Sequence, residues 1–152
     1  MKKILITSFI LFAFFSSSFS QSKYKYQKFQ EEKGVVFYYK YSHSNFLNKK
    51  SPLRLILKIE NTNAYNTKVN FVVDYYWKAM ISANSEKPRT CCVKANKSIK
   101  GRYHKLHFAP FEYTNEQVLS DDFFIELSGI EITKVDDCKK NEEKIKKETE
   151  KE

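Results

Sequence analysis

The clearest structural signal in the chain is the stretch LRLILKIENTNAYNTKVNFVVDYYW, residues 53–77. Apolar and polar side chains alternate over residues 53–60 and again over residues 68–77, which is the period of a β-strand with one buried face. Three asparagines lie in the segment between them, 61–66, and asparagine is favoured in turns. The stretch therefore predicts two core strands joined by an asparagine-rich turn.

Shorter runs of β-branched and aromatic residues predict further strands at residues 35–41, 90–94, 102–108 and 123–133, with a connection at 78–89 and a turn at 96–101. The alternation in the last run shifts by one residue across Ser128-Gly129, which indicates a β-bulge. Thr114-Asn115-Glu116-Gln117 matches a capping box and predicts one short helical turn. About seven short strands without a long helix predict an all-β fold, an antiparallel β-sandwich.

The asparagine-rich turn and its flanking strands also carry a family resemblance. A strand ending in Ile59-Glu60-Asn61-Thr62-Asn63, followed by Val69-Asn70-Phe71-Val72-Val73, resembles bacterial immunoglobulin-like modules. The resemblance covers residues 53–77 and implies an immunoglobulin-like sandwich. Trp77 precedes all three cysteines, so the antibody pattern of a Trp bracketed by cysteines is not met. No functional residue is carried over.

The two ends of the chain differ from its middle. Lys2-Lys3, an apolar run at 4–15 and several serines have the layout of a signal peptide, residues 1–20. The run is shorter than the roughly 20 residues of a spanning helix. Residues 136–152 hold six Lys and seven Asp or Glu, which predicts a charged tail, disordered or frayed-helical. We therefore expect an exported protein, periplasmic or extracellular, with one β-sandwich domain at 21–135.

Three cysteines in an exported chain predict one disulfide and one free thiol. Adjacent strand residues face opposite sides, so only one of Cys91 and Cys92 is placed to pair with Cys138. We predict the Cys92–Cys138 bond, with Cys91 as the second choice. His104 and His107 do not have the spacing of a zinc site on a strand, and we predict no metal or cofactor.

The sequence contains no catalytic motif of the common hydrolase, metalloprotease or nucleotide-binding kinds. This favours a non-enzymatic binding or structural module at the cell envelope; the alternative is a glycan-binding or glycan-processing secreted protein. Tyr38, Tyr76 and Trp77 have two interpretations, as core residues or as an exposed platform for sugar rings.

Charge is segregated along the chain. Residues 87–105 hold seven Lys or Arg and no acidic residue, whereas residues 106–133 hold six acidic residues and no Lys or Arg. In one interpretation the strands at 102–108 and 123–133 lie opposite each other and their charges compensate. In the other, a positive patch binds an anionic glycan, lipopolysaccharide or an envelope protein. The patch would consist of Lys94, Lys97, Lys100 and Arg102. No nucleic-acid partner is expected.

Overall fold

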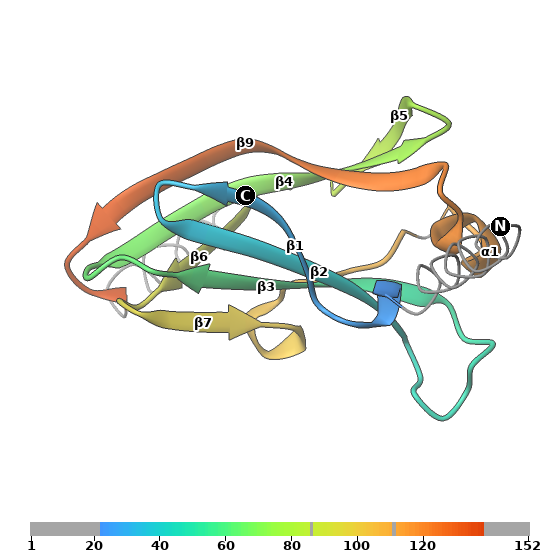
Figure 1. Ribbon diagram of the computed structural model, residues 1–152, viewed down its shortest axis with the longest axis horizontal. Coiled ribbons are helices and arrows are strands. Elements are labelled where there is room, and N and C mark those ends of the chain that lie inside the picture. Colours follow the sequence, from blue (N-terminus) through green and yellow to red (C-terminus); the bar gives the residue numbers. More distant parts are fainter. Residues whose placement is uncertain (1–21, 86, 111, 139–152) are drawn as a thin grey trace, which may run out of the picture.

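A computed structural model describes residues 22–85, 87–110 and 112–138, which form two antiparallel β-sheets (Figure 1). Within these residues the strands are β1 (Gln27–Glu32), β2 (Val35–His43), β3 (Leu53–Asn61), β4 (Asn66–Trp77), β5 (Met80–Asn84), β6 (Arg89–Val93), β7 (Lys97–Lys100), β8 (His107–Phe108) and β9 (Phe123–Val135). The helical turns are η1 (Ser22–Tyr24), η2 (Arg102–His104) and α1 (Asn115–Leu119). The predicted all-β antiparallel sandwich is confirmed. The predicted signal peptide and residues 139–152 of the predicted tail lie outside the described residues.

Each of the two predicted core strands is the centre of its own sheet. In the first sheet β2 pairs with one edge of β3, while β7 and β8 share the other edge, and β1 extends the sheet beyond β2. In the second sheet β9 follows one edge of β4, while β6 and β5 share the other. The strands β3 and β4 therefore do not pair with each other, and the asparagine-rich segment carries the chain between sheets.

The core lies between the facing sides of the sheets. Every second residue of β3 from Leu53 to Ile59 is buried, and so is every second residue of β4 from Thr67 to Tyr75. The rings of Phe37 and Phe71 meet across the sheets with centroids 6.1 Å apart. Burying each large apolar side chain contributes about 1.5–3 kcal/mol, which makes this double layer the main source of stability.

Side chains in the asparagine-rich segment form hydrogen bonds that connect this segment to the β1–β2 turn and to the end of β6. The Asn61 amide donates to the carbonyls of Tyr65 and Val93, and the Asn63 amide donates to that of Lys33. Gly34, in the β1–β2 turn, has a φ of 73°, and a Cβ there would lie 2.5 Å from Asn63 Oδ1. Glycine is therefore favoured at this position, because another residue would be strained at this backbone angle and its Cβ would displace the Asn63 side chain.

Two local predictions are confirmed. Residues 129 and 130 of β9 lie opposite the single residue Phe71 of β4, and Gly129 has a φ of 58°, as in a β-bulge that uses glycine. At the start of α1, the Thr114 hydroxyl accepts a hydrogen bond from Gln117 N–H, and the Gln117 side chain accepts one from Thr114 N–H. This is the predicted capping box.

The predictions for residues 78–108 are partly wrong, and nine strands are present among the described residues instead of about seven. The predicted turn at 96–101 contains β7. This strand has only one buried residue, Ile99, so its sequence shows no alternation of apolar and polar residues. The predicted strand at 102–108 is interrupted because Lys105 adopts a left-handed conformation after η2. The predicted connection at 78–89 contains β5, which follows a two-residue turn at Lys78-Ala79 that lacks the usual Asn or Gly.

The predicted disulfide joins Cys92 of β6 to Cys138, with the Cα atoms 5.4 Å apart. Cys91 faces the other side of β6 and is a free thiol that packs against the core. Burial raises the pKa of Cys91 to about 12, so this thiol is protonated at neutral pH and is a poor nucleophile.

Candidate functional site

A pocket of about 340 Å³ opens at the edge of the sandwich formed by β6 and β8. Arg54, Tyr75, Asn84, Ser85, Arg89, His107, Phe108 and Ala109 line it. These residues come from both sheets, so the pocket lies where the two layers separate. Among the described lining residues none is acidic. We call this cavity the basic pocket.

Two of the three arginines of the chain, Arg54 and Arg89, line the pocket together with His107. The chain has 27 Lys and Arg residues, of which only positions 54, 89 and 102 are arginine. Each of these guanidiniums lies close enough to His107 to lower its pKa electrostatically. Arginine presents a planar set of donors that matches carboxylate, sulfate and phosphate groups. The distribution of arginine therefore indicates an anion site.

Two polar atoms in the lining are buried and lack a hydrogen-bond partner among the described residues: Nε of Arg89 and Nδ1 of His107. Arg89 pairs with Phe71 in the β4–β6 ladder, and its guanidinium lies 5.5 Å from the ring centre of Phe108. An unsatisfied buried polar atom costs about 1–3 kcal/mol. A bound anion would satisfy Nε directly, and Nδ1 whenever that nitrogen carries a proton.

The electrostatics of the basic pocket favour an uncharged His107 when no anion is bound. Burial lowers the pKa of His107 below its ordinary value, and the charges of Arg54, Arg102 and Arg89 lower it further. Burial also raises the pKa of the Tyr75 hydroxyl, which stays protonated at neutral pH. The pocket thus has a cationic lining and a histidine that would gain a proton more readily beside an anion.

The predicted patch residues follow the same side of the molecule but do not gather at one point. Lys94 lies after β6, Lys97 and Lys100 begin and end β7, and Arg102 is in η2. Because a strand rises about 3.3 Å per residue, the Cα atoms of Lys97 and Lys100 are roughly 10 Å apart. Among the described residues none of these four makes an ion pair. Their backbone positions lead from the end of β6 along β7 toward the basic pocket, and we call these four residues the basic edge.

The acidic segment does not compensate this line by cross-strand pairing. β8, which contains the end of the predicted basic strand, pairs with β3 in the first sheet. β9, which contains the predicted acidic strand, pairs with β4 in the second sheet, on the edge away from β6. The interpretation in which strands 102–108 and 123–133 lie opposite each other is therefore wrong, because they belong to different sheets.

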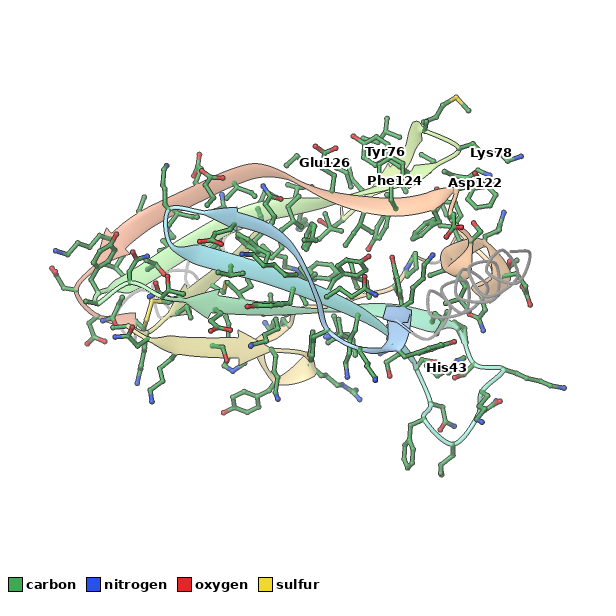
Figure 2. All side chains as sticks on the ribbon, viewed as in Figure 1. His43, Tyr76, Lys78, Asp122, Phe124 and Glu126 are labelled. Carbon is green, nitrogen blue, oxygen red and sulfur yellow. A yellow bond between two sulfur atoms is a disulfide. The ribbon has the colours of Figure 1, made fainter. Side chains whose placement is uncertain are left out.

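The suggested aromatic platform is not assembled either. Tyr38 is on β2 of the first sheet, where Lys58 covers its ring at 4.6 Å. Tyr76 and Trp77 are on β4 of the second sheet and point to opposite faces. Tyr76 stacks on Phe124 of β9, with ring centroids 4.7 Å apart (Figure 2). Its ring thus has a partner within the sheet.

Sequence reasoning missed Arg54, Arg89 and His107 as site residues. They come from three separate segments, and only the pairing of β8 with β3 brings His107 to Arg54. The scarcity of arginine was the one signal in the sequence that pointed to them. In the described part of the chain, no three His, Cys, Asp or Glu side chains group as metal ligands. No described helix has the length and apolar content that crossing a membrane requires.

Comparisons of the chain with protein-family models, with curated proteins and with solved structures give no match. Function is therefore inferred from the basic pocket and the basic edge.

Proposed function

We propose that this chain is an exported, non-enzymatic β-sandwich module that binds an acidic glycan of the cell envelope, such as lipopolysaccharide or an acidic polysaccharide. The observation that carries the proposal is a pocket lined by Arg54, Arg89 and His107, in which the buried Arg89 Nε has no hydrogen-bond partner among the described residues. Export is supported by the layout of residues 1–20.

A glycan suits this site better than a small free anion, because the positive charge continues beyond the basic pocket. Lys100 and Arg102 lie between the pocket and the more distant Lys94 and Lys97. A polymer with repeated anionic groups can place one group in the pocket and others along the basic edge. The apolar lining from Phe108 and Ala109 is suited to the sugar ring that carries the enclosed group.

The immunoglobulin-like relationship is part of this proposal. It is supported by the sequence resemblance over residues 53–77 and agrees with a sandwich whose central strands are β3 and β4. Sandwich modules of this class present binding groups on edges and end loops. Binding at the β6–β8 edge fits that use of the scaffold.

Replacing Arg54 and Arg89 with glutamine is expected to weaken binding of a heparin-derived hexasaccharide about 30-fold. Each change removes a charge-assisted contact, and two such contacts together are worth about 2 kcal/mol after solvent competition. Isothermal titration calorimetry measures the change. Replacing both arginines with lysine keeps the charge but removes the planar guanidinium groups, so we expect about tenfold weaker binding of the hexasaccharide.

The control is Lys28→Gln with Lys33→Gln, which removes two positive charges from β1 and its turn, on the far edge of the first sheet. This variant should bind like the parent. Replacing Lys94, Lys97 and Lys100 with serine should reduce the salt dependence of binding, because fewer counterions are displaced. Equal losses in the arginine and control variants, or no binding by the parent at low salt, would contradict the proposed function.

The same binding is expected to strengthen as the pH falls from about 8 through the ordinary histidine value of about 6.5. A bound sulfate favours the imidazolium form, so the pKa of His107 is higher in the complex than in the free protein, where burial and three arginines lower it. Between the two pKa values binding takes up a proton, and above both values affinity is independent of pH.

Titrations with the hexasaccharide at several pH values measure this dependence, because its sulfate groups do not titrate in the range. His107→Gln should abolish the effect. His104→Gln, which changes an exposed histidine in η2, should preserve it. A pH dependence that survives in His107→Gln would assign it to another group.

A further inference from the structure

The β2–β3 loop, residues 44–52, exposes two adjacent large apolar side chains. Phe46 is 82% exposed and Leu47 is 79% exposed, whereas the large apolar residues of the flanking strands mostly face the core. The loop projects from the sandwich, with His43 at its base (Figures 1 and 2). Exposing two adjacent apolar side chains to water is unfavourable in free energy, which indicates that a partner covers them.

The loop is held in this shape by its own hydrogen bonds. The Ser51 hydroxyl accepts from Asn45 N–H at 3.1 Å and lies 2.7 Å from the Asn48 carbonyl oxygen. The side-chain oxygens of Asn45 and Asn48 accept from Leu47 N–H and Lys50 N–H. The polar side chains thus fold the loop inward, while Phe46 and Leu47 are left outside.

Contacts to the rest of the fold fix the base of the loop. The Asn115 side chain of α1 donates to the Ser51 carbonyl at 3.0 Å and accepts from Leu53 N–H at 2.8 Å. His43 Nδ1 lies 2.8 Å from the same Ser51 carbonyl. The apolar tip is therefore presented by an ordered support, so little conformational entropy remains to be lost when it binds.

We propose that this loop docks the protein on a membrane surface that contains anionic lipid, with Phe46 and Leu47 entering the interfacial region. Lys49 and Lys50 follow the apolar pair after one residue, Asn48, and are exposed, and their charges complement anionic headgroups. Apolar residues flanked by lysines are the composition of interfacial anchors, in which lysine stems lie along the acyl boundary and their ammonium groups stay in the headgroup layer.

The adjacent lysines favour a lipid surface over a protein groove. A groove that encloses Phe46 and Leu47 would also bring Lys49 and Lys50 close to its rim and would need matched carboxylates there. An anionic bilayer supplies negative charge on every side of the insertion point. This inference is independent of the proposed glycan site, because it uses none of the residues of the basic pocket or the basic edge.

Phe46→Ser with Leu47→Ser is expected to reduce binding to vesicles of phosphatidylcholine and phosphatidylglycerol about tenfold or more. The protein used is the processed chain recovered after export, so that the apolar segment at 4–15 does not contribute. Vesicle co-sedimentation gives the partition coefficient. Lys49→Ser with Lys50→Ser should give about tenfold weaker binding at low salt and little change at high salt.

Two control variants distinguish insertion of Phe46 and Leu47 from nonspecific adsorption to vesicles. Tyr103→Ser removes an aromatic side chain that is 92% exposed on η2 and should leave vesicle binding unchanged. Lys28→Gln with Lys33→Gln, which removes two exposed charges from the far edge of the first sheet, should also leave it unchanged. The glycan site is tested separately by hexasaccharide binding to Arg54→Gln with Arg89→Gln, so failure of one proposal is distinguished from failure of the other.

Phe46→Trp gives a local readout, because its emission should shift to the blue with anionic vesicles and be quenched by lipids brominated in the acyl chain. Trp77 supplies the background signal, measured in the parent. Absence of vesicle binding by the parent would overturn the proposal and leave a protein groove as the partner. Binding of Phe46→Trp without quenching of the introduced fluorophore, or undiminished binding by Phe46→Ser with Leu47→Ser, would also overturn it.

Discussion

Replacing Cys92 with serine is expected to lower the free energy of unfolding by about 4 kcal/mol. The disulfide joins residues separated by 46 positions. In the chain-entropy model a loop of this length restricts the unfolded chain by about that amount. The bond also ties the segment after β9 to β6, and these strands lie on opposite edges of β4. Loss of the bond therefore removes a restraint on the end of β9 in the folded protein, and it also increases the conformational entropy of the unfolded chain.

Urea denaturation of the parent and the variant measures this difference. Cys91→Ser is the matched control, because it changes the neighbouring residue, a free thiol that contacts the core, at a cost of about 1 kcal/mol. The parent in reducing agent should unfold like Cys92→Ser in the same buffer. A parent insensitive to reductant, or a Cys91→Ser variant as unstable as Cys92→Ser, would show that the bond does not supply this stability.

Local patterns predicted the parts of the fold that depend on neighbours in sequence. Alternation identified the buried faces of β3 and β4, because each pattern is long enough to exclude a helix. The phase shift at Gly129 identified the bulge, and the spacing of Thr114 and Gln117 identified the capping box. The opposite orientation of Cys91 and Cys92 on one strand limited the disulfide to one of them, and Cys92 was the preferred choice.

Pairing between distant strands was not predictable in the same way. Alternation shows which face of a strand is buried, but it does not show which strand lies beside it. The segments at 53–60 and 68–77 are adjacent in sequence and yet central to different sheets. The short strands β7 and β8 depend on β3 for their hydrogen bonds, so their own residues carry a weak signal.

The basic pocket illustrates the same limit at the level of function. Arg54 follows the first residue of a core strand, Arg89 begins β6 and His107 begins β8, so no motif of fixed spacing contains them. The charge pattern identified the segment that contains the residues of the basic edge, because residues 87–105 hold seven basic residues and no acidic one. It did not locate the pocket, since Arg54 lies far outside that segment and meets it only through sheet pairing.

Replacing Asn61 with leucine is expected to lower the free energy of unfolding by about 3 kcal/mol. Asn61 ends β3 and is 1% exposed. Its amide nitrogen donates to the carbonyls of Tyr65, Val93 and Lys94 at 2.8, 3.1 and 3.3 Å, and its oxygen accepts from Asn63 N–H at 3.0 Å. Because Val93 ends β6 in the other sheet, this one side chain joins the two layers.

Leucine has a similar volume, so the loss would come from polar groups left without partners and not from a cavity. Asn70→Leu is the control on β4, where the side chain is half-buried and accepts one hydrogen bond, from the Thr90 hydroxyl. That change should cost less than about 1 kcal/mol. Urea denaturation compares the two variants, and equal losses would show that the corner formed by Asn61 has no special role.

Asn61→Asp tests the direction of these hydrogen bonds. A carboxylate cannot donate to the three carbonyls, so its ionised form is destabilised and the pKa of this aspartate should be higher in the folded protein than in the unfolded chain. The protonated form can still donate one hydrogen bond. Relative to the parent, the stability of this variant should therefore be retained best below the unfolded value of about 3.9 and be lost as the pH rises through the folded value. A variant whose stability relative to the parent is independent of pH would mean that the carbonyls of Tyr65, Val93 and Lys94 do not require a donor at this corner.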